Sequence, residues 1–387
     1  MKKINIGILT FPISEAGNIP LSNLLDVLKP FSNNLYLITG NDGYTFFKDD
    51  ENVCAFGVRY KSSKYTHIRI INYISVQLKI SYKLIKLSKS ADLWIFFIGG
   101  ETLLLPMITA KFLRKIVILA SAGSSLQCSK LKDFNLSKVI EILESINRSL
   151  SNYIVLYSQN IVEESKLEKY AYKISIARKH FLNFSKFKME TGFNKRSNLV
   201  GYIGALSEEK GTLEFVEAIP KILKQKNDTE FLIVGDGRLR GYVERYLYDN
   251  GLTRKVELAG WISHDEIPKY LNRLKLLVLP SYTEGLPNVM IEAMACGTPV
   301  LAHPVGAVPD IINDGETGFL MKNNSPKCIS ANVVRALDHH DLEGVVQRAQ
   351  AFVEQEFSYE AAVKSYRSLL EPILLKYVFS SHLLFKI

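Results

Sequence analysis

Short runs of apolar residues recur along this chain, and most are followed by a segment with the 3.6-residue periodicity of a helix. Residues 4–9, 231–234 and 276–279 are three such runs. A strand that is apolar on both sides is buried on both faces, which happens where helices cover both sides of a parallel sheet. The alternation therefore predicts an α/β protein with doubly wound parallel sheets.

The alternation occurs twice, on either side of a polar and basic segment at residues 184–197. At 387 residues the chain is too long for one ordinary hydrophobic core. We therefore predict two Rossmann-like domains, at residues 1–190 and 197–356. A last helical pattern follows within residues 357–387.

The predicted strands fall into two sets. In the first domain they are residues 4–9, 35–38, 53–58, 68–71, 93–98, 117–119 and 153–157. In the second domain they are residues 199–203, 231–234, 256–259, 276–279 and 299–302. Helices are predicted between many of these strands, and the boundaries carry an error of a few residues.

Cysteine, histidine and aspartate spacing argues against metal sites. The four cysteines form no Cys-x-x-Cys pair, and no two histidines have the spacing of zinc ligands on a helix. These features favour a reducing compartment, so we expect a cytoplasmic protein without a disulfide framework. The metal-binding motif Asp-x-Asp is absent as well. We therefore expect the protein to use neither a metal ion nor a bound cofactor.

Two segments resemble membrane signals. Residues 1–17 begin like a signal peptide, but Asn5 and Pro12 interrupt the apolar run and no cleavage site follows. Residues 93–113 have the length of a membrane span but contain glycines and charged residues. We expect no transmembrane segment.

The charge of the chain is unevenly distributed. Residues 1–196 contain 28 Lys and Arg against 15 Asp and Glu, a net charge of +13, whereas the remaining residues contain 20 against 24, a net charge of −4. Such a surplus predicts an anionic partner for the first half. Nucleic acid, phospholipid headgroups and a phosphorylated substrate all fit, and so does a basic surface with no partner.

Residues 281–300 contain the pattern that is richest in chemistry. They follow the predicted strand 276–279, at the carboxyl edge of a parallel sheet, where open α/β folds bind ligands. Pro287 has no N–H and suits the first position of a helix. The amides of Asn288 and Val289 then lie in the first turn without helical partners, and together with the helix dipole they make an anion site. We expect a phosphate there.

Two glutamates, Glu284 and Glu292, flank this anion site. Carboxylates bind phosphate poorly but accept hydrogen bonds well from vicinal hydroxyls. One glutamate can therefore hold a sugar and the other a ribose, on either side of a diphosphate. Two solvated glutamates on a surface helix would have the same spacing. The neighbouring Gly285, Pro287 and Gly297 favour the functional interpretation.

This segment resembles the Glu-x7-Glu signature of the retaining GT-B enzymes in glycosyltransferase family 4, also called glycosyl transferases group 1. The similarity extends over about residues 200–321, in blocks at residues 201–211, 231–237, 260–262, 284–292 and 314–319. The first half is similar in architecture alone. The resemblance implies two Rossmann-like domains that face each other across a cleft. It also implies a C-terminal helix that crosses back to the first domain.

The resemblance also implies roles for individual residues. Glu292 would bind the ribose, Glu284 the hydroxyls of the donor sugar, and Lys210 the diphosphate as it leaves with growing negative charge. Lys210 and Glu284 are thus the expected catalytic residues. The other expected donor-binding residues are Gly204, Trp261, Ile262, Gly285, Leu286, Pro287, Asn288 and Val289. Gly17 marks the loop expected on the acceptor side.

The implied reaction transfers a sugar from a UDP- or GDP-sugar to a hydroxyl acceptor, with retention, in polysaccharide, glycolipid or cell-envelope glycan synthesis. Two departures from the family bear on activity. Ala205 stands where the family usually has an arginine, and the loop at residues 120–125 lacks the histidine that many members carry. A sugar-nucleotide-binding protein with reduced catalysis and a GT-B epimerase are the alternatives. We expect no nucleic acid partner.

Residues 76–89 alternate leucine and isoleucine with lysine at near-helical spacing. Such a helix can lie on anionic lipid, and it can equally bury its apolar side in a domain core. The surplus of positive charge favours the first interpretation, since each lysine near an anionic surface contributes about 1 kcal/mol. We predict salt-sensitive peripheral association with the inner face of the membrane, close to a lipid-linked acceptor.

Overall fold

The computed structural model describes residues 3–120 and 134–384. The chain divides into two compact units. The first comprises Met1–Phe181 and Tyr359–Ile387, and the second comprises Leu182–Ser358. The second unit thus begins slightly before the predicted boundary segment, because Phe193 belongs to its core and Arg196 is buried.

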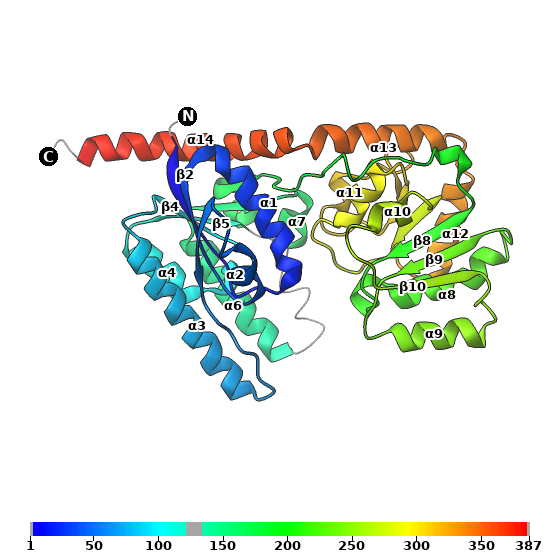
Figure 1. Cartoon of the computed structure of the whole chain (residues 1–387), viewed down its shortest axis with the longest axis horizontal. Coiled ribbons are helices and arrows are strands. Elements are labelled where there is room, and N and C mark those ends of the chain that lie inside the picture. Colours follow the sequence, from blue (N-terminus) through cyan, green and yellow to red (C-terminus); the bar gives the residue numbers. More distant parts are fainter. Residues whose placement is uncertain (1–2, 121–133, 385–387) are drawn as a thin grey trace. The chain divides into compact units, whose positions relative to one another are not determined.

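Within the described residues, the first unit contains a parallel sheet of seven strands in the order β3-β2-β1-β4-β5-β6-β7 (Figure 1). The strands are β1 (Ile4–Leu9), β2 (Ser32–Thr39), β3 (Val53–Gly57), β4 (Leu93–Phe96), β5 (Ile116–Ala120), β6 (Tyr153–Leu156) and β7 (Ile174–Ile176). The α-helices are α1 (Asn18–Leu28), α2 (Asp42–Phe47), α3 (Thr66–Leu87), α4 (Leu104–Phe112), α6 (Phe134–Leu150), α7 (Asn160–Glu164) and α14 (Tyr359–Leu384). The doubly wound parallel sheet predicted for this half of the chain is confirmed.

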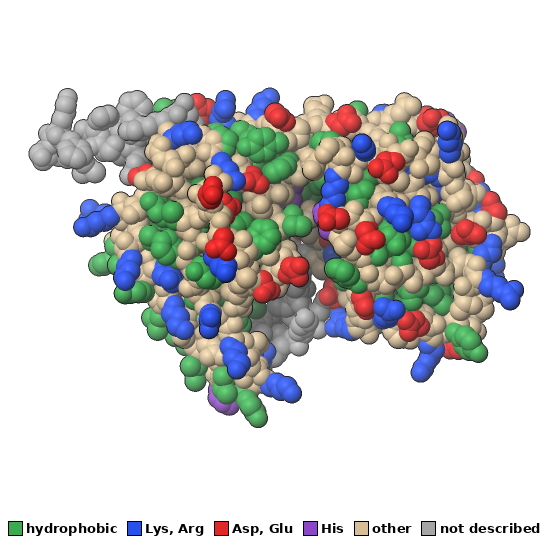
Figure 2. Space-filling view, in the orientation of Figure 1, with side chains coloured by type: hydrophobic (Ala, Val, Ile, Leu, Met, Phe, Trp, Pro, Cys, Tyr) green, Lys and Arg blue, Asp and Glu red, His purple; other side chains and the backbone are tan. Residues whose placement is uncertain are grey.

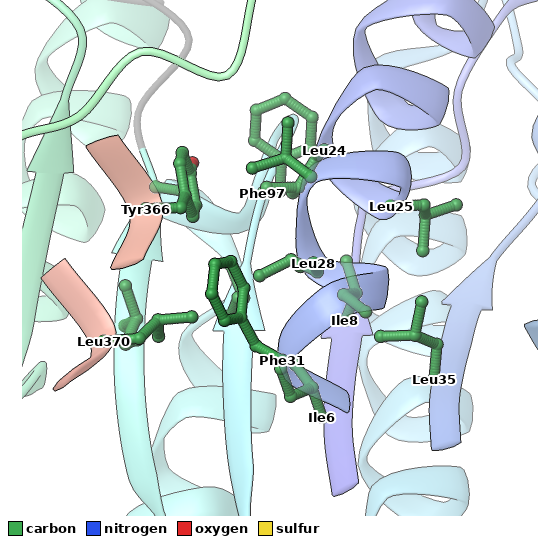
Figure 3. Close-up of a cluster of buried hydrophobic side chains, with 14 of the residues drawn as sticks. Ile6, Ile8, Leu24, Leu25, Leu28, Phe31, Leu35, Phe97, Tyr366 and Leu370 are labelled. Atoms are coloured by element: carbon green, nitrogen blue, oxygen red, sulfur yellow. The ribbon is translucent and has the colours of Figure 1, made fainter. Parts of the chain in front are cut away.

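The last helix, α14, completes the hydrophobic core of the first unit. Tyr366 and Leu370 are buried in the same cluster as Ile8 of β1 and Leu28 of α1. Figure 3 shows the side chains of Tyr366 and Leu370 meeting those of β1 and α1, which lie at the opposite end of the sequence. The first unit therefore consists of two separate stretches of the chain, and its core needs the second stretch.

One predicted strand of the first unit is wrong. Residues 68–71 form part of the long helix α3 instead. The side chains of Val76, Ile80 and Leu84, spaced by four residues, are buried in the core of the unit. This tertiary packing determines the conformation and overrides the strand preference of the isoleucines. Strand β7, which contains three residues, is too short to have been recognised from the sequence.

The second unit contains, within the described residues, a parallel sheet of six strands in the order β10-β9-β8-β11-β12-β13. The strands are β8 (Leu199–Ile203), β9 (Glu230–Val234), β10 (Val256–Gly260), β11 (Leu276–Leu279), β12 (Val300–Ala302) and β13 (Phe319–Leu320). The α-helices are α8 (Thr212–Leu223), α9 (Arg240–Asp249), α10 (Ile267–Leu271), α11 (Asn288–Ala295), α12 (Pro326–Leu337) and α13 (Leu342–Glu356). All five predicted strands are present.

Strand order in the second sheet reverses between β8 and β11, which are hydrogen-bonded neighbours. Loops that follow two such strands diverge toward opposite sides of the sheet and leave a crevice at its carboxyl edge. The segment 280–287 follows β11 and leads into α11, so it lies beside this crevice. In the described part of the chain, no helix is long and apolar enough to span a lipid bilayer.

Candidate functional site

A pocket of about 260 Å³ lies at the carboxyl edge of the second sheet. It is lined by Tyr202, Ile203, Gly204, Lys210, Leu279, Ser281, Glu284, Leu286, Pro287, Asn288 and Val289. Seven of these were predicted from the sequence, namely Gly204, Lys210, Glu284, Leu286, Pro287, Asn288 and Val289. The fold brings them together because β8 and β11 are neighbouring parallel strands that end at the same edge.

An ion pair lies in the wall of this pocket. The Lys210 Nζ atom donates a hydrogen bond to Glu284 Oε1 over 2.7 Å, and the Ser281 hydroxyl donates to the same oxygen over 2.7 Å. The side chain of Glu284 is 10% exposed and that of Lys210 is 33% exposed. The carboxylate is therefore fixed in place, while the ammonium group keeps access to a ligand.

Two glycines allow the backbone around this pair to pack closely. Gly211 has a φ of +68°, and a Cβ atom there would lie 2.0 Å from the carbonyl oxygen of Pro280. Gly306 has a φ of +61°, and its Cβ would lie 2.3 Å from the carbonyl oxygen of Glu284. Any side chain at either position would displace the loop that carries the glutamate.

The start of α11 differs by one residue from the prediction. Pro287 does not occupy the first helical position, because its ψ of 107° is extended and the helix begins at Asn288. The carbonyl oxygen of Pro287 accepts a hydrogen bond from the amide of Met290 over 3.0 Å. The amides of Asn288 and Val289 are still the first of the helix, with no preceding turn to bond to, and both residues line the pocket. The anion-site geometry is therefore retained.

Glu292 lies deeper in α11, where it is 4% exposed. The His264 Nε2 atom is 2.8 Å from Glu292 Oε1. On the other side of the ring, the Lys186 Nζ atom is 3.3 Å from His264 Nδ1 and 2.7 Å from Asp265 Oδ1. This chain of polar contacts orients the carboxylate of Glu292. His264 was not among the residues predicted from the sequence, although it lies only three residues after Trp261.

The remaining predicted residues lie outside the pocket lining. Trp261 and Ile262 follow β10, and Trp261 is 75% exposed. The carbonyl oxygen of Gly285 accepts a hydrogen bond from the amide of Ala307 over 2.9 Å, which ties the loop down. Gly17 lies in the first unit, at the end of the short 3-10 helix Glu15–Gly17.

Tyr202 anchors the turn that contains Ala205. Its hydroxyl donates to the carbonyl oxygen of Ala205 over 2.7 Å and lies 2.9 Å from Thr212 Oγ1. Burial raises the pKa of Tyr202 well above its ordinary value, so the group stays a neutral donor. Ala205 itself supplies no charge, and Lys210 is the single cation among the described residues that line the pocket. Most of the loop without a histidine, residues 121–125, lies outside the described residues.

Several known proteins match the part of the chain that contains this site. Residues 183–354 match the family model described as glycosyl transferases group 1. An uncharacterized glycosyltransferase of Methanocaldococcus jannaschii is 27% identical over 227 residues, which are 58% of this chain and 63% of that protein. The amylovoran biosynthesis glycosyltransferase AmsK of Erwinia amylovora is 32% identical over 177 residues, 44% of this chain and 43% of that protein.

The chain thus spans less than two thirds of the length of these relatives. A crystal structure of HepE from Anabaena in complex with UDP superimposes with a TM-score of 0.73 and 18% identity, over 96% of this chain and 100% of that chain. This structural match extends over both units and shows the fold, which is GT-B. The family match covers nearly all of the second unit, which holds the pocket. The second unit is therefore similar to the glycosyl transferases group 1 family over nearly all of its length.

Proposed function

We propose that the protein is a retaining glycosyltransferase of family 4 that moves a sugar from a UDP- or GDP-sugar to a hydroxyl acceptor. The observation that carries this proposal is the Lys210–Glu284 pair, which lines a pocket at the N-terminus of α11. A cation, two free helical amides and a fixed carboxylate within one pocket match the groups of a sugar diphosphate. Glu292 on the same helix supplies a second carboxylate for the ribose.

Each group has a distinct task in this proposal. Lys210 and the amides of Asn288 and Val289 hold the diphosphate, and their effect grows as the leaving group gains charge in the transition state. The carboxylate of Glu284, already fixed by Ser281, accepts hydrogen bonds from the sugar hydroxyls. When the donor binds, Lys210 interacts with the diphosphate and loses part of its interaction with Glu284. No metal ion is required, because Lys210 and the helix supply the positive charge.

The names of two similar proteins support the substrate class. HepE was crystallised with UDP, which favours a uridine donor, and AmsK takes part in amylovoran biosynthesis, which favours a role in polysaccharide, glycolipid or cell-envelope glycan synthesis. Thermal unfolding with UDP, GDP, ADP and their sugars tests the donor, since a ligand of the folded state raises the melting temperature. We expect UDP or GDP to raise it in the presence of a metal chelator. If no nucleotide stabilises the protein, the donor assignment is wrong.

A sugar-nucleotide-binding protein with reduced catalysis is the second candidate. The observation that favours it is Ala205, which leaves Lys210 as the single cation among the described pocket residues. The two candidates differ in turnover. A transferase hydrolyses or transfers the sugar of a bound donor, and Ala205→Arg should increase its rate. Nucleotide binding without any turnover, in the wild type and in the variant, would favour the second candidate. An epimerase would instead convert the nucleotide-sugar without releasing the sugar.

We also propose that the first unit binds the surface of anionic membranes through α3. One face of this helix is buried, yet the opposite face is apolar as well, and its exposed side chains are Ile70, Ile71, Ile74, Leu78, Tyr82 and Ile85. Lysines 79, 83 and 86 lie on the same helix. Basic and hydrophobic side chains interleave on the part of the surface that carries α3 (Figure 2). Exposed apolar residues rimmed by lysines fit the boundary between acyl chains and anionic headgroups.

Sedimentation with vesicles tests the membrane proposal. Vesicles of phosphatidylglycerol and phosphatidylcholine should bind the protein at low salt and release it at high salt, whereas phosphatidylcholine alone should bind weakly. Ile71→Ser with Leu78→Ser should abolish binding. Tyr248→Ser with Leu375→Ser is the matched control, because it removes two other exposed apolar side chains. Equal binding to both kinds of vesicle, or an equal loss in both variants, would rule out this role for α3.

A further inference from the structure

A second pocket, of about 710 Å³, lies in the first unit beside β3. Strand β3 is at the edge of the sheet, so one of its sides has no neighbouring strand. The pocket is lined by β3 and the chain that follows it, by α2, and by Lys83 of α3. Its volume is large enough for a sugar with a phosphate attached.

The charge of this pocket is strongly positive. Lys48, Arg59, Lys61 and Lys83 line it, against the single carboxylate of Asp42, which accepts a hydrogen bond from the amide of Glu15. Lys48 is 3.7 Å from a carboxylate oxygen of Asp49. The other three cations form no ion pair within the described residues. The pocket therefore presents positive charge that the protein does not neutralise.

Lysines beside an edge strand often serve to prevent pairing with other sheets. That role does not explain this cluster, because Lys48 belongs to the turn after α2 and Lys83 belongs to α3. Lys83 is further held over the ring of Phe56, with its Nζ atom 5.7 Å from the ring centre. Cations from three different elements thus converge on one pocket. Such convergence is typical of a binding site for an anion.

The wall of the pocket is rigid and partly aromatic. The ring of Tyr60 packs edge to face on the ring of Phe11, with ring centres 4.9 Å apart. The backbone amide of Tyr60 donates a hydrogen bond to the side-chain oxygen of Asn41 over 3.1 Å. Asn41 has a φ of +53°, which is uncommon for a residue other than glycine. Strained residues of this kind persist where the surrounding structure fixes them, and they cluster at ligand sites. Tyr44 and Phe56 add apolar surface against which a sugar ring can pack.

We propose that this pocket binds a phosphate group of a phosphorylated acceptor. The proposal rests on the glycosyl transfer proposed above, and it narrows the acceptor to a class. A surplus of three positive charges matches the two or more negative charges of a phosphate ester or diphosphate better than the single charge of a carboxylate. Arginine binds phosphate oxygens through two parallel N–H groups, and lysine binds them as a point charge. The phosphate can belong to a lipid-linked acceptor or to a soluble one.

Calorimetric titration with inorganic pyrophosphate tests the site. All proteins in this titration are full-length and carry Lys210→Ala. This substitution removes the cation of the proposed nucleotide pocket, so that pyrophosphate does not bind there. Removing two pocket cations outside α3 with Arg59→Gln and Lys61→Gln should weaken pyrophosphate binding by about tenfold or more. The control removes the same charge with Lys64→Gln and Lys169→Gln, two exposed lysines of the first unit that neither line the pocket nor lie on α3. Melting temperatures establish that both variants fold.

We expect the control to bind pyrophosphate within about twofold of its parent. An equal loss in both variants would mean that general charge attracts the anion, and the proposal would be wrong. It would also be wrong if the parent protein did not bind pyrophosphate. Binding of pyrophosphate does not require glycosyl transfer. A protein that binds it at this pocket but transfers no sugar would therefore contradict the proposed function alone.

Vesicle sedimentation distinguishes the two sources of the phosphate. Vesicles contain phosphatidic acid, whose phosphate monoester carries up to two negative charges, in phosphatidylcholine, and the same pair of variants is compared. If the pocket variant loses both vesicle binding and pyrophosphate binding, the phosphate belongs to a lipid headgroup. If it loses pyrophosphate binding alone, the phosphate belongs to a soluble acceptor. Both results support the site, whereas unchanged pyrophosphate binding in the pocket variant overturns it.

Discussion

Lys210 and Glu284 are separated by 74 positions in the sequence, yet their side chains form a hydrogen bond of 2.7 Å. The distance results from two strands that end side by side and from two glycines that let the loops approach. Ser281 donates a second hydrogen bond to the same carboxylate oxygen. The pair is thus preorganised before a donor is present, and a preorganised charge costs little rearrangement when the transition state forms.

Removing the cation should slow the reaction more than it weakens donor binding. Lys210→Ala should lower kcat by about 100-fold or more while donor KM changes little, because the cation acts chiefly on charge that develops in the transition state. Steady-state kinetics with varied donor measure both. Lys210→Arg, which keeps the charge, is the control and should retain part of the activity. Normal turnover of Lys210→Ala would mean that another group neutralises the diphosphate.

Glu292 should govern nucleotide affinity. If its carboxylate accepts hydrogen bonds from the ribose, Glu292→Ala should weaken binding of UDP or GDP by about 1–3 kcal/mol. His264→Ala should have a smaller effect, since it removes a group that orients the carboxylate and leaves the carboxylate itself. Glu266→Ala, at an exposed position nearby, should have none. Unchanged affinity of Glu292→Ala in calorimetry would disprove the assignment.

Among the elements, α14 shows most clearly how the first unit is stabilised. It lies at the end of the chain but shares a core with β1 and α1 (Figure 3). Its buried residues Ala362, Tyr366, Leu370 and Ile373 follow helical spacing and form one stripe. Without this helix, the apolar side of α1 and several residues of the sheet would be exposed to water.

A single substitution in that stripe should destabilise the protein measurably. Leu370→Ala should cost about 2–5 kcal/mol, because it removes a fully buried side chain and leaves a cavity. Leu375→Ala on the same helix should change stability by less than about 0.5 kcal/mol, since Leu375 is 55% exposed. Urea unfolding of the full chain measures the difference. Similar stability of the two variants would show that α14 does not contribute to the core.

Deleting residues 358–387 is the stronger form of the same test. The first unit would then lose a whole helix and expose its apolar core, so we expect insoluble protein. A soluble and fully folded truncation would contradict the packing described for α14.

At the scale of the whole molecule, the two units differ in how the chain builds them. The second is one continuous stretch, Leu182–Ser358, with its own hydrophobic core, whereas the first needs residues from both ends of the chain. Every described residue that lines the proposed nucleotide pocket lies in the continuous unit. The basic pocket beside β3 lies in the other one.

The second unit should therefore fold and bind nucleotide alone. A fragment of residues 182–358 should unfold cooperatively, and UDP or GDP should raise its melting temperature. The same fragment with Glu292→Ala is the control and should respond less. A folded fragment that does not respond to any nucleotide, while the full chain does, would mean that the pocket needs the first unit.

The sequence, together with its resemblance to a known family, determined the fold class, most strands of both sheets and seven of the eleven residues that line the pocket of the second unit. It could do so because buried parallel strands are apolar throughout. In addition, the segment from Ser281 to Val289 follows such a strand and contains a glycine for the turn and a proline just before the helix. Prediction from the sequence failed at residues 68–71, where isoleucines that favour a strand lie in a helix fixed by the packing of Val76 and Ile80.

Tertiary structure alone decided which distant groups meet. The contact of His264 with Glu292 and the cluster of cations beside β3 join residues that no local pattern relates. Side chains from separate elements become neighbours only when the sheet sets the order of its strands. That order is determined by long-range packing of the whole core, and a sequence window contains no record of it.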